Sequence, residues 1–478
     1  MKERLIVFLV LLAGVVLSAL VITSWRRHPL DLTVGKRLPL ADELAALSPP
    51  VDASGELVQI GAGFARSAGL PSSLGGAWPC FRGTNHDNIV SDGIRLADSW
   101  PAGGPPVLWS VEAGEGYAGP VIMNGRVYLL DYDGGENADT LRCLSLDDGR
   151  EIWRRWYKVR IKRNHGMSRT VPAVSGQYVV TIGPRCHVMC VDSVTGDFRW
   201  GIDLEKEWGA TVPMWYTGEC PLIDGGQAVI AVGGRALLIG VDLETGKVLW
   251  QTPNPRKWQM SHSSVVPMEL DGQKMYVYCA LGGIAGVSAG DTNRGNLLWD
   301  TAEWNHQVVA PAPVPMGAGR LFVTAGYGAG SAMFSVARDA GKYSVRQIYK
   351  LDKKVFASEQ QTPIFYRGYL YSVLPADAGA ARKQAVCINP EDGQVMWTSG
   401  AGERFGLGPF MIADDKLLLL EDDGVLTMIR ASEKGYIRLA RARVLDGKEA
   451  WAPMAMAGGL LIVRDYGRMK CLDLRAGQ

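Results

Sequence analysis

Arginines, histidines, aromatic residues and carboxamides gather in short segments that each end at a proline. The segments are RNHGMSRTVP, WGATVPMWYTGECP, WQMSHSSVVP, WNHQVVAP, ASEQQTP and RFGLGP. Cationic and aromatic side chains together suit an anionic or polyol ligand. The alternative is that these side chains satisfy the backbone of the loops that carry them. The candidate ligand-binding residues are Arg163, His165, Arg169, Trp215, Tyr216, His262, His306, Glu359, Gln360 and Arg404.

The same segments do not match a metal centre or a haem attachment site. His165, His262 and His306 precede three different prolines and lack the close sequence spacing of zinc ligands. No two cysteines are adjacent, and the chain has no Cys-x-x-Cys-His stretch. We therefore assign no catalytic residue and no metal site, and we expect no resident cofactor.

A repeated motif separates the segments. CVDSVTGDFRW (190–200) and GVDLETGKVLW (240–250) share a small residue, an Asp, a Thr-Gly pair and a Trp at fixed spacing. A strand before the Asp, a glycine turn and a second strand ending at Trp predict a β-hairpin. The small position is Cys, Gly or Ser in different copies, which predicts core residues there. The motif tryptophans are Trp109, Trp153, Trp200, Trp250, Trp299 and Trp397.

Eight prolines recur at intervals of 44 to 52 residues, at positions 120, 172, 221, 267, 313, 363, 409 and 453. Each is followed by two short apolar strands and then by the hairpin, so each unit has four strands. A four-stranded sheet cannot bury both faces alone, and repeats of this length stack around an axis. The sequence predicts an all-β, eight-bladed β-propeller with the proline-ended segments around its central channel.

The two ends of the array predict how the propeller closes. The last unit, from Pro453 to Leu474, has room for three strands, whereas PPVLWSVEAGEG (105–116) is an extra copy of the Trp strand. We expect residues 107–111 to supply the fourth strand of the eighth blade, with Trp109 in the docking position. Such pairing removes a free sheet edge.

Residues 5–22 are apolar and uncharged, with Lys2 and Arg4 before them. As a helix they span about 27 Å, enough to cross a bilayer core, so we expect an uncleaved anchor. The alternative is a signal that is removed by cleavage. We assign residues 1–28 to this signal or anchor, 29–76 to a flexible spacer and 77–478 to the propeller. We expect the propeller to be periplasmic or otherwise extracytoplasmic, held at the inner membrane by residues 5–22.

The charge balance excludes one class of partner. The chain has 50 Lys and Arg residues against 49 Asp and Glu residues, a net charge of +1. It therefore lacks a global field that would attract nucleic acid. The membrane contact that we expect is made by the N-terminal segment alone.

The Asp-x-x-Thr-Gly-x-x-x-Trp stretch resembles the tryptophan-docking motif of the PQQ-like (pyrroloquinoline quinone) repeat propellers, the quinoprotein alcohol dehydrogenase-like superfamily. The same repeat forms the non-catalytic propeller of the outer-membrane assembly lipoprotein. WPCFRG (78–83) is similar to the leading segment of envelope-located members. The resemblance covers residues 105–478 and implies the fold. Catalytic members of the alcohol type use a disulfide between adjacent cysteines, calcium held by Glu, Asn and Asp, and an Asp base. Adjacent cysteines are absent from this sequence.

A complete fold motif beside an incomplete catalytic motif leaves two functions open. The first is a binding or scaffolding module for a protein or envelope-polymer partner. The alternative is a PQQ-dependent quinoprotein dehydrogenase that oxidises an alcohol or a sugar. That reading requires PQQ stacked on Trp215 or Tyr216 and calcium near Glu359.

Overall fold

The computed structural model describes residues 12, 14–19, 23, 58–162 and 167–477. The chain divides into two units, Met1–Gly55 and Glu56–Gln478. The predicted anchor, residues 5–22, lies largely outside the described residues, as do the candidate residues Arg163 and His165. Within the described parts of the chain, no helix is both long and apolar enough to cross a membrane.

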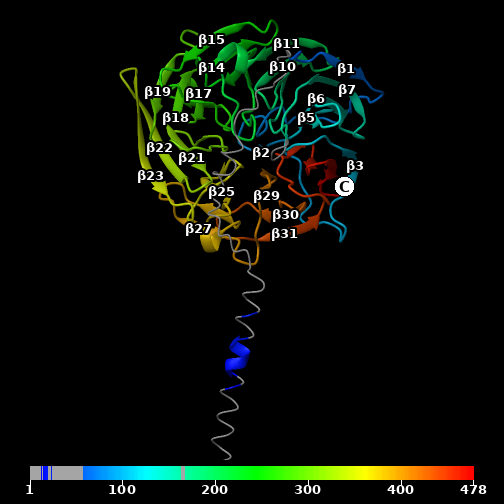
Figure 1. Cartoon of the computed structure of the whole chain (residues 1–478), viewed down its shortest axis with the longest axis vertical. Helices are drawn as coiled ribbons and strands as arrows, with labels where there is room; N and C mark the ends of the chain where they lie inside the picture. Colours follow the sequence, from blue (N-terminus) through cyan, green and yellow to red (C-terminus); the bar gives the residue numbers. More distant parts are fainter. Residues whose placement is uncertain (1–11, 13, 20–22, 24–57, 163–166, 478) are drawn as a thin grey trace, which may run out of the picture. The chain divides into compact units, whose positions relative to one another are not determined.

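The second unit is an eight-bladed β-propeller, as predicted, with its blades arranged around a central axis (Figure 1). Each blade is an antiparallel sheet of four strands that run from the axis outward. The inner strands are β4 (Val121–Met123), β8 (Ala173–Ser175), β12 (Leu222–Asp224), β16 (Val266–Leu270), β20 (Val314–Pro315), β24 (Ile364–Tyr366), β28 (Phe410–Ala413) and β32 (Ala455–Ala457). The second strands are β5 (Arg126–Asp133), β9 (Tyr178–Ile182), β13 (Gln227–Ala231), β17 (Gln273–Ala280), β21 (Arg320–Ala325), β25 (Tyr369–Val373), β29 (Lys416–Leu420) and β33 (Leu460–Arg464).

The third and outer strands form the hairpins that carry the repeated motif. The third strands are β6 (Ala138–Ser145), β10 (His187–Asp192), β14 (Ala236–Asp242), β18 (Gly283–Ser288), β22 (Gly330–Asp339), β26 (Ala385–Ile388), β30 (Val425–Arg430) and β34 (Arg468–Asp473). The outer strands are β7 (Glu151–Lys158), β11 (Phe198–Asp203), β15 (Val248–Pro253), β19 (Leu297–Thr301), β23 (Lys342–Leu351), β27 (Val395–Thr398), β31 (Arg438–Arg443) and β3 (Val107–Glu112). Two short helices, α3 (Leu204–Trp208) and η1 (Gly379–Ala381), lie between strands.

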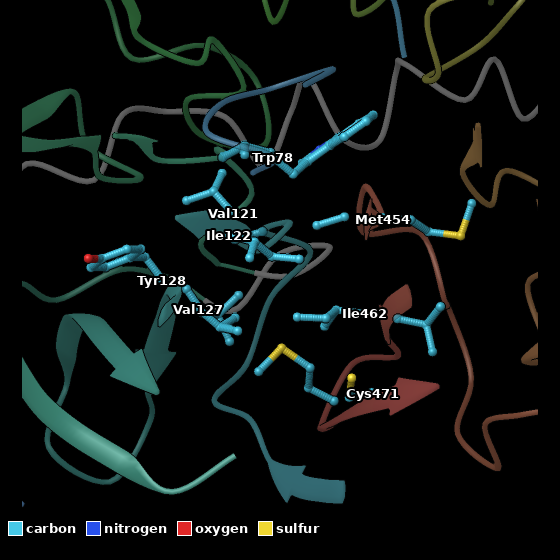
Figure 2. Packing of buried hydrophobic residues seen from close by; sticks show 14 of the residues in the cluster. Trp78, Val121, Ile122, Val127, Tyr128, Met454, Ile462 and Cys471 are labelled. Carbon is cyan, nitrogen blue, oxygen red and sulfur yellow. The ribbon is translucent and has the colours of Figure 1, made fainter. Parts of the chain in front are cut away.

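The eighth blade combines strands from both ends of the propeller unit. β3 pairs antiparallel with β34, and Trp109 lies opposite Cys471 in this ladder. The buried core at this junction includes Ile122 of blade 1 and Met454 and Ile462 of the last repeat, together with Trp78 (Figure 2). The first and last blades therefore share one hydrophobic cluster.

Two further strands extend the sheets, and one of them corrects a predicted boundary. β1 (Gly63–Arg66) pairs with β7 as a fifth strand of blade 1, and β2 (Ile89–Val90) runs parallel to β28. β1 lies inside the segment 29–76 that we assigned to a spacer, so residues 58–76 belong to the propeller unit. The guanidinium of Arg155 lies 4.6 Å from the Phe64 ring centroid and donates to the Gly61 carbonyl at 2.6 Å. These contacts join residues far apart in the sequence, so no local pattern revealed them.

The docking tryptophans explain why the motif begins with a small residue. In each of six blades the Trp lies directly opposite that residue on the neighbouring third strand. A Cβ atom at Gly240 would lie 2.2 Å from the Trp250 ring, and one at Gly286 would lie 2.2 Å from the Trp299 ring. The indole therefore crosses the small position and leaves little space there.

The indoles also join neighbouring blades. The indole N–H of Trp109 donates to Leu146 O at 2.8 Å, and that of Trp200 donates to Leu243 O at 2.9 Å. The turn glycine of the next blade packs against the same ring, as Gly149 does against Trp109. Burying an indole with its N–H bonded gives each interface a large apolar contact and a satisfied donor. The tryptophans therefore serve packing between blades.

Candidate functional site

The connections that lead from each outer strand to the next inner strand are hydrogen-bonded to one another around the axis. Together the bonds pass through all eight connections, so the predicted gathering of these segments is present. The bonds are Tyr117 N to Ser168 O, Val171 N to Cys220 Sγ, Cys220 N to Ser264 Oγ, His262 N to Val309 O, Ala312 N to Thr362 Oγ1, Gln361 Nε2 to Leu407 O and Trp451 O, and Tyr117 Oη to Glu449 Oε2.

Residues 78–90, which we call the axial segment, span the propeller axis. Pro79 O accepts a hydrogen bond from Val174 N of blade 2, and Arg82 donates to Pro363 O beside blade 6 at 3.0 Å. Blades 2 and 6 lie opposite each other in a ring of eight, so a segment that contacts both must cross the axis. The axial segment therefore occupies the channel.

The axial segment also contacts further blades at its two ends. Trp78 forms a β-bridge with Ile122 of β4, and β2 at the other end of the segment pairs with β28. His86 lines a pocket of 280 Å³ with residues of β12, β16 and β17. The sequence singled out WPCFRG only by resemblance, and the structure shows that these residues fill the centre of the propeller.

Three aromatic rings, two from the connections and one from the β21–β22 loop, stack near Arg169. The Trp215 ring lies 6.1 Å from the His262 ring and 5.9 Å from the Tyr327 ring, with interplanar angles of 24° and 28°. The Arg169 guanidinium carbon lies 6.0 Å from the Tyr117 ring centroid. The structure thus brings together Arg169, Trp215 and His262 of the predicted set. We call Tyr117, Arg169, Trp215, His262 and Tyr327 the aromatic cluster.

The backbone at the centre of this cluster is strained. Trp215 and Tyr216 are consecutive residues with φ of 61° and 71°, in the left-handed region that side chains with a Cβ rarely adopt. Tyr216 is buried, and its hydroxyl donates to Lys162 O at 2.8 Å. With this backbone conformation the Trp215 indole contacts the His262 and Tyr327 rings, which come from other parts of the propeller.

Two members of the cluster were not among the predicted residues. Tyr117 precedes Pro120 in EGYAGP and follows the same proline-ended pattern as the others, so the sequence held a signal for it. Tyr327 lies in the β21–β22 loop, a different type of connection from those that end at the inner-strand prolines. No pattern in the sequence pointed to that loop.

The cluster carries one cation at neutral pH. Burial lowers the pKa of Arg169 to about 10, so the guanidinium stays charged. Burial, and secondly the charge of Arg169, lower the pKa of His262 to about 3, so the imidazole is neutral. An aromatic group with one cation suits a planar or anionic group of modest charge.

A buried carboxyl lies beside the ring of connections. Asp139 is fully buried and accepts hydrogen bonds from Tyr157 Oη at 2.9 Å and Ser168 Oγ at 2.6 Å. Burial raises the pKa of Asp139 to about 7, although the two hydrogen bonds act in the opposite direction. Asp139 was not predicted, because a single Asp on a strand has no distinctive sequence spacing. Its hydroxyl partners make it a structural link between blades 1 and 2.

Two further predicted residues make local contacts. His306 packs against Trp304 with ring centroids 4.3 Å apart, and its pKa is lowered by burial and by Lys350 of the outer strand β23. Arg404 donates to the backbone carbonyls of Ala380 and Arg382 around η1. The contacts described for these two side chains are local ones, so a place beside His262 on one ring stays a prediction.

Glu359 and Gln360 line a small cavity between blades 6 and 7. The cavity measures 10 Å³, about the space that one water molecule needs. Burial raises the pKa of Glu359.

The two aromatic residues that the dehydrogenase alternative requires are already engaged within the protein. A quinone needs an accessible aromatic face, but Trp215 already stacks on two rings and Tyr216 is buried. Calcium needs several oxygen ligands. Within residues 58–162 and 167–477, no group of three His, Cys, Asp or Glu side chains lies close enough to hold a metal ion.

Comparison with known proteins supports the fold. A family model described as outer membrane protein assembly factor BamB matches residues 137–374. No curated protein sequence matches the chain. The structure of BamB from Moraxella catarrhalis is similar, with a TM-score of 0.53 and 14% identity over 77% of this chain and 99% of that one.

Quinoprotein structures are equally similar. A quinohemoprotein alcohol dehydrogenase from Comamonas testosteroni has a TM-score of 0.57 and 12% identity, over 84% of this chain and 81% of that one. The corresponding values for quinohemoprotein alcohol dehydrogenase ADHIIG from Pseudomonas putida HK5 are 0.56 and 14%, over the same shares. At these identities the likeness shows the fold alone. The repeat motif, the family match and the eight four-stranded blades agree and support a PQQ-like β-propeller family for this chain.

Proposed function

We propose that this protein is an envelope-located binding or scaffolding module, whose blade edges and funnel-side connections hold a protein or envelope-polymer partner. The observation that supports the proposal is the occupied channel: the axial segment crosses the axis, and the connections bond to one another. A protein whose centre is filled by its own chain presents its outer surfaces to partners. The match to an assembly factor supports a protein partner.

The test is site-specific photo-crosslinking in intact cells. A crosslinking amino acid replaces exposed Lys448 in the connection before blade 8, or exposed Lys434 in the β30–β31 hairpin as the matched control. Connections and these hairpins leave opposite ends of a blade. We expect one defined crosslinked protein or polymer species from position 448 and none from position 434. Identical patterns at both positions would contradict a funnel-side partner.

The dehydrogenase alternative is tested by calorimetric titration of the full chain with PQQ and calcium. We expect no heat of binding at micromolar quinone, because the predicted aromatic positions are already stacked or buried. Saturable binding, together with alcohol-dependent dye reduction, would overturn the scaffold proposal in favour of the enzyme.

A further inference from the structure

The outer strand of blade 5 is unlike the other outer strands. β23 spans ten residues, whereas the next longest, β7, spans eight and β27 spans four. β7 pairs on its outward side with β1, but β23 is the last strand of its sheet among the described residues. An edge strand of this length presents a row of unpaired backbone N–H and C=O groups.

β23 is firmly attached to the propeller on its other side. Blade 5 has no docking Trp, and Leu351 packs instead against Gly393, the turn glycine of blade 6. The Tyr349 hydroxyl donates to Pro390 O at 2.5 Å, which replaces the indole hydrogen bond of other blades. The strand is therefore a fixed, extended template rather than a loose tail.

The exposed positions of β23 carry uncompensated positive charge. Lys342, Arg346 and Lys350 are exposed, and none of them has an ion pair within the described part of the chain. Arg346 lies opposite Ser335. In six other blades the docking Trp occupies the position that Arg346 occupies here. The strand contains no acidic residue.

β31 of blade 7 provides the contrast. It also carries three arginines, but Arg438, Arg441 and Arg443 pair with Glu403, Glu421 and Asp423. Blade 7 therefore neutralises its own basic edge, whereas blade 5 does not. An edge that nothing within the described residues neutralises is complementary to an acidic segment.

The molecule itself shows that an outer edge accepts an added strand. β1 is a short segment from outside the repeats, and it pairs antiparallel with β7 over four residues. β-Strand addition of this kind derives affinity from main-chain hydrogen bonds and specificity from alternate side chains. Ile348, 47% exposed between Arg346 and Lys350, is the extra residue of a β-bulge in β23 and adds an exposed apolar side chain to the same edge.

We infer that the β23 edge binds an extended acidic segment of a partner protein by strand addition. This inference rests on the proposed scaffold function and identifies one surface and one kind of partner for it. The acidic side chains of the segment pair with Lys342 and Arg346 on one face of the sheet and with Lys350 on the other, while the backbone of the segment extends the sheet of blade 5.

The test uses the full chain and a synthetic peptide of alternating glutamate and valine that matches β23 in length. Binding is measured by fluorescence anisotropy against wild type and against the triple variant Lys342→Glu, Arg346→Glu, Lys350→Glu. The substitutions turn three attractive cross-strand pairs into repulsive ones, so we expect the triple variant to bind about tenfold more weakly or worse. The substituted side chains are exposed, and circular dichroism verifies that the variant folds.

The matched control reverses three exposed lysines away from blade 5, as Lys247→Glu, Lys257→Glu, Lys434→Glu. These residues also lack ion pairs within the described part of the chain, so the change in net charge is identical. We expect this variant to bind the peptide as wild type does. Equal weakening in both variants would mean that only net charge matters, and would overturn the inference.

Two further probes separate strand addition from other modes. A peptide with proline in place of valine keeps the charge but loses every second backbone N–H and is a poor strand former, so we expect it not to bind. Vesicles containing phosphatidylserine test a membrane surface in place of a peptide. Equal binding of the proline peptide, or binding of vesicles without binding of the first peptide, overturns the inference. A crosslink at position 448 that persists in the blade 5 variant would leave the scaffold function intact.

Discussion

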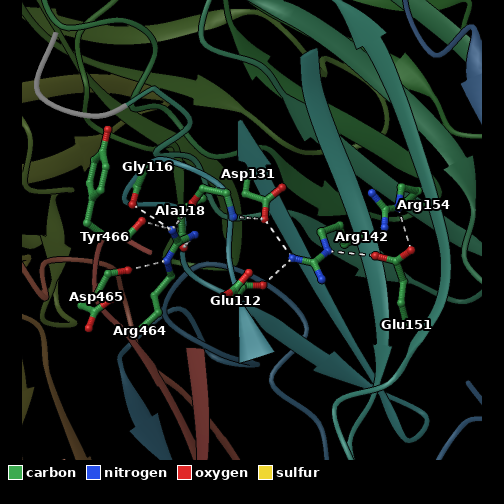
Figure 3. Close-up of polar contacts among 11 residues, drawn as sticks. Glu112, Gly116, Ala118, Asp131, Arg142, Glu151, Arg154, Arg464, Asp465 and Tyr466 are labelled. Carbon is green, nitrogen blue, oxygen red and sulfur yellow. Dashed lines mark hydrogen bonds and ion pairs between the residues drawn. The ribbon is translucent and has the colours of Figure 1, made fainter. Parts of the chain in front are cut away.

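Replacing Arg464 tests how the first and last blades are joined. The Arg464 side chain is fully buried at the end of β33 and donates to five carbonyl groups. Figure 3 shows the side chain among Gly116, Ala118, Asp465 and Tyr466. Three of the carbonyl groups, on Gly114, Gly116 and Ala118, belong to the connection from β3 to β4, at 2.8, 3.0 and 3.4 Å. One guanidinium thus satisfies carbonyls that lead from the eighth blade into the first.

We expect Arg464→Met to lower the free energy of unfolding by about 3–5 kcal/mol. A hydrogen bond to a charged group contributes about 1.5–3 kcal/mol, and removing the donor leaves buried acceptors without partners. Part of this loss is offset, because burial disfavours the charged guanidinium and lowers its pKa. The variant Arg464→Lys retains the charge but has fewer donors, so we expect an intermediate loss.

The assay is urea unfolding followed by tryptophan fluorescence, with Arg468→Met as the matched control. Arg468 is exposed and its side chain makes a single bond, to Ser110 Oγ at 3.3 Å. We expect this control to stay within about 0.5 kcal/mol of wild type. If Arg464→Met unfolds at the same urea concentration as Arg468→Met, water satisfies the five carbonyls and the guanidinium does not join the blades.

Three further predictions concern packing, pH and the chain boundary. Gly286→Val should lower stability by about 1–3 kcal/mol in urea unfolding, because its Cβ would meet the Trp299 ring, whereas Gly103→Ala, in open space, should not. The folded state holds a proton on Asp139 from its ordinary pKa of 3.8 up to about 7, so stability should fall as pH rises from about 4 to about 7. Asp139→Asn should flatten this slope, and an unchanged slope would contradict the assignment. Removal of residues 1–57 should preserve the urea midpoint, whereas removal of 1–76 should lower it and promote association, because β1 then leaves the edge of β7 exposed.

The number of blades, their strand composition and the role of the tryptophans could be predicted from the sequence. The contacts within a blade join residues that are close along the chain, so the hairpin, the glycine turn and the Trp recur together. The pairing of Trp with a small residue is local too, as Cys190 and Trp200 show. Only a small residue fits beneath the indole, so the position opposite each docking Trp is restricted and the repeat is visible in the sequence.

The centre of the molecule was decided by tertiary structure. The axial segment contacts Ile122 and Pro363, which lie in blades distant from each other, and no period in the sequence encodes such a path. Tyr327 joins the aromatic cluster from a loop that the proline pattern does not mark. His306 precedes an inner strand as His262 does, yet it packs against Trp304 near the outer strand. Sequence spacing locates a connection, but long-range packing and the backbone conformation of each connection decide where its side chains lie.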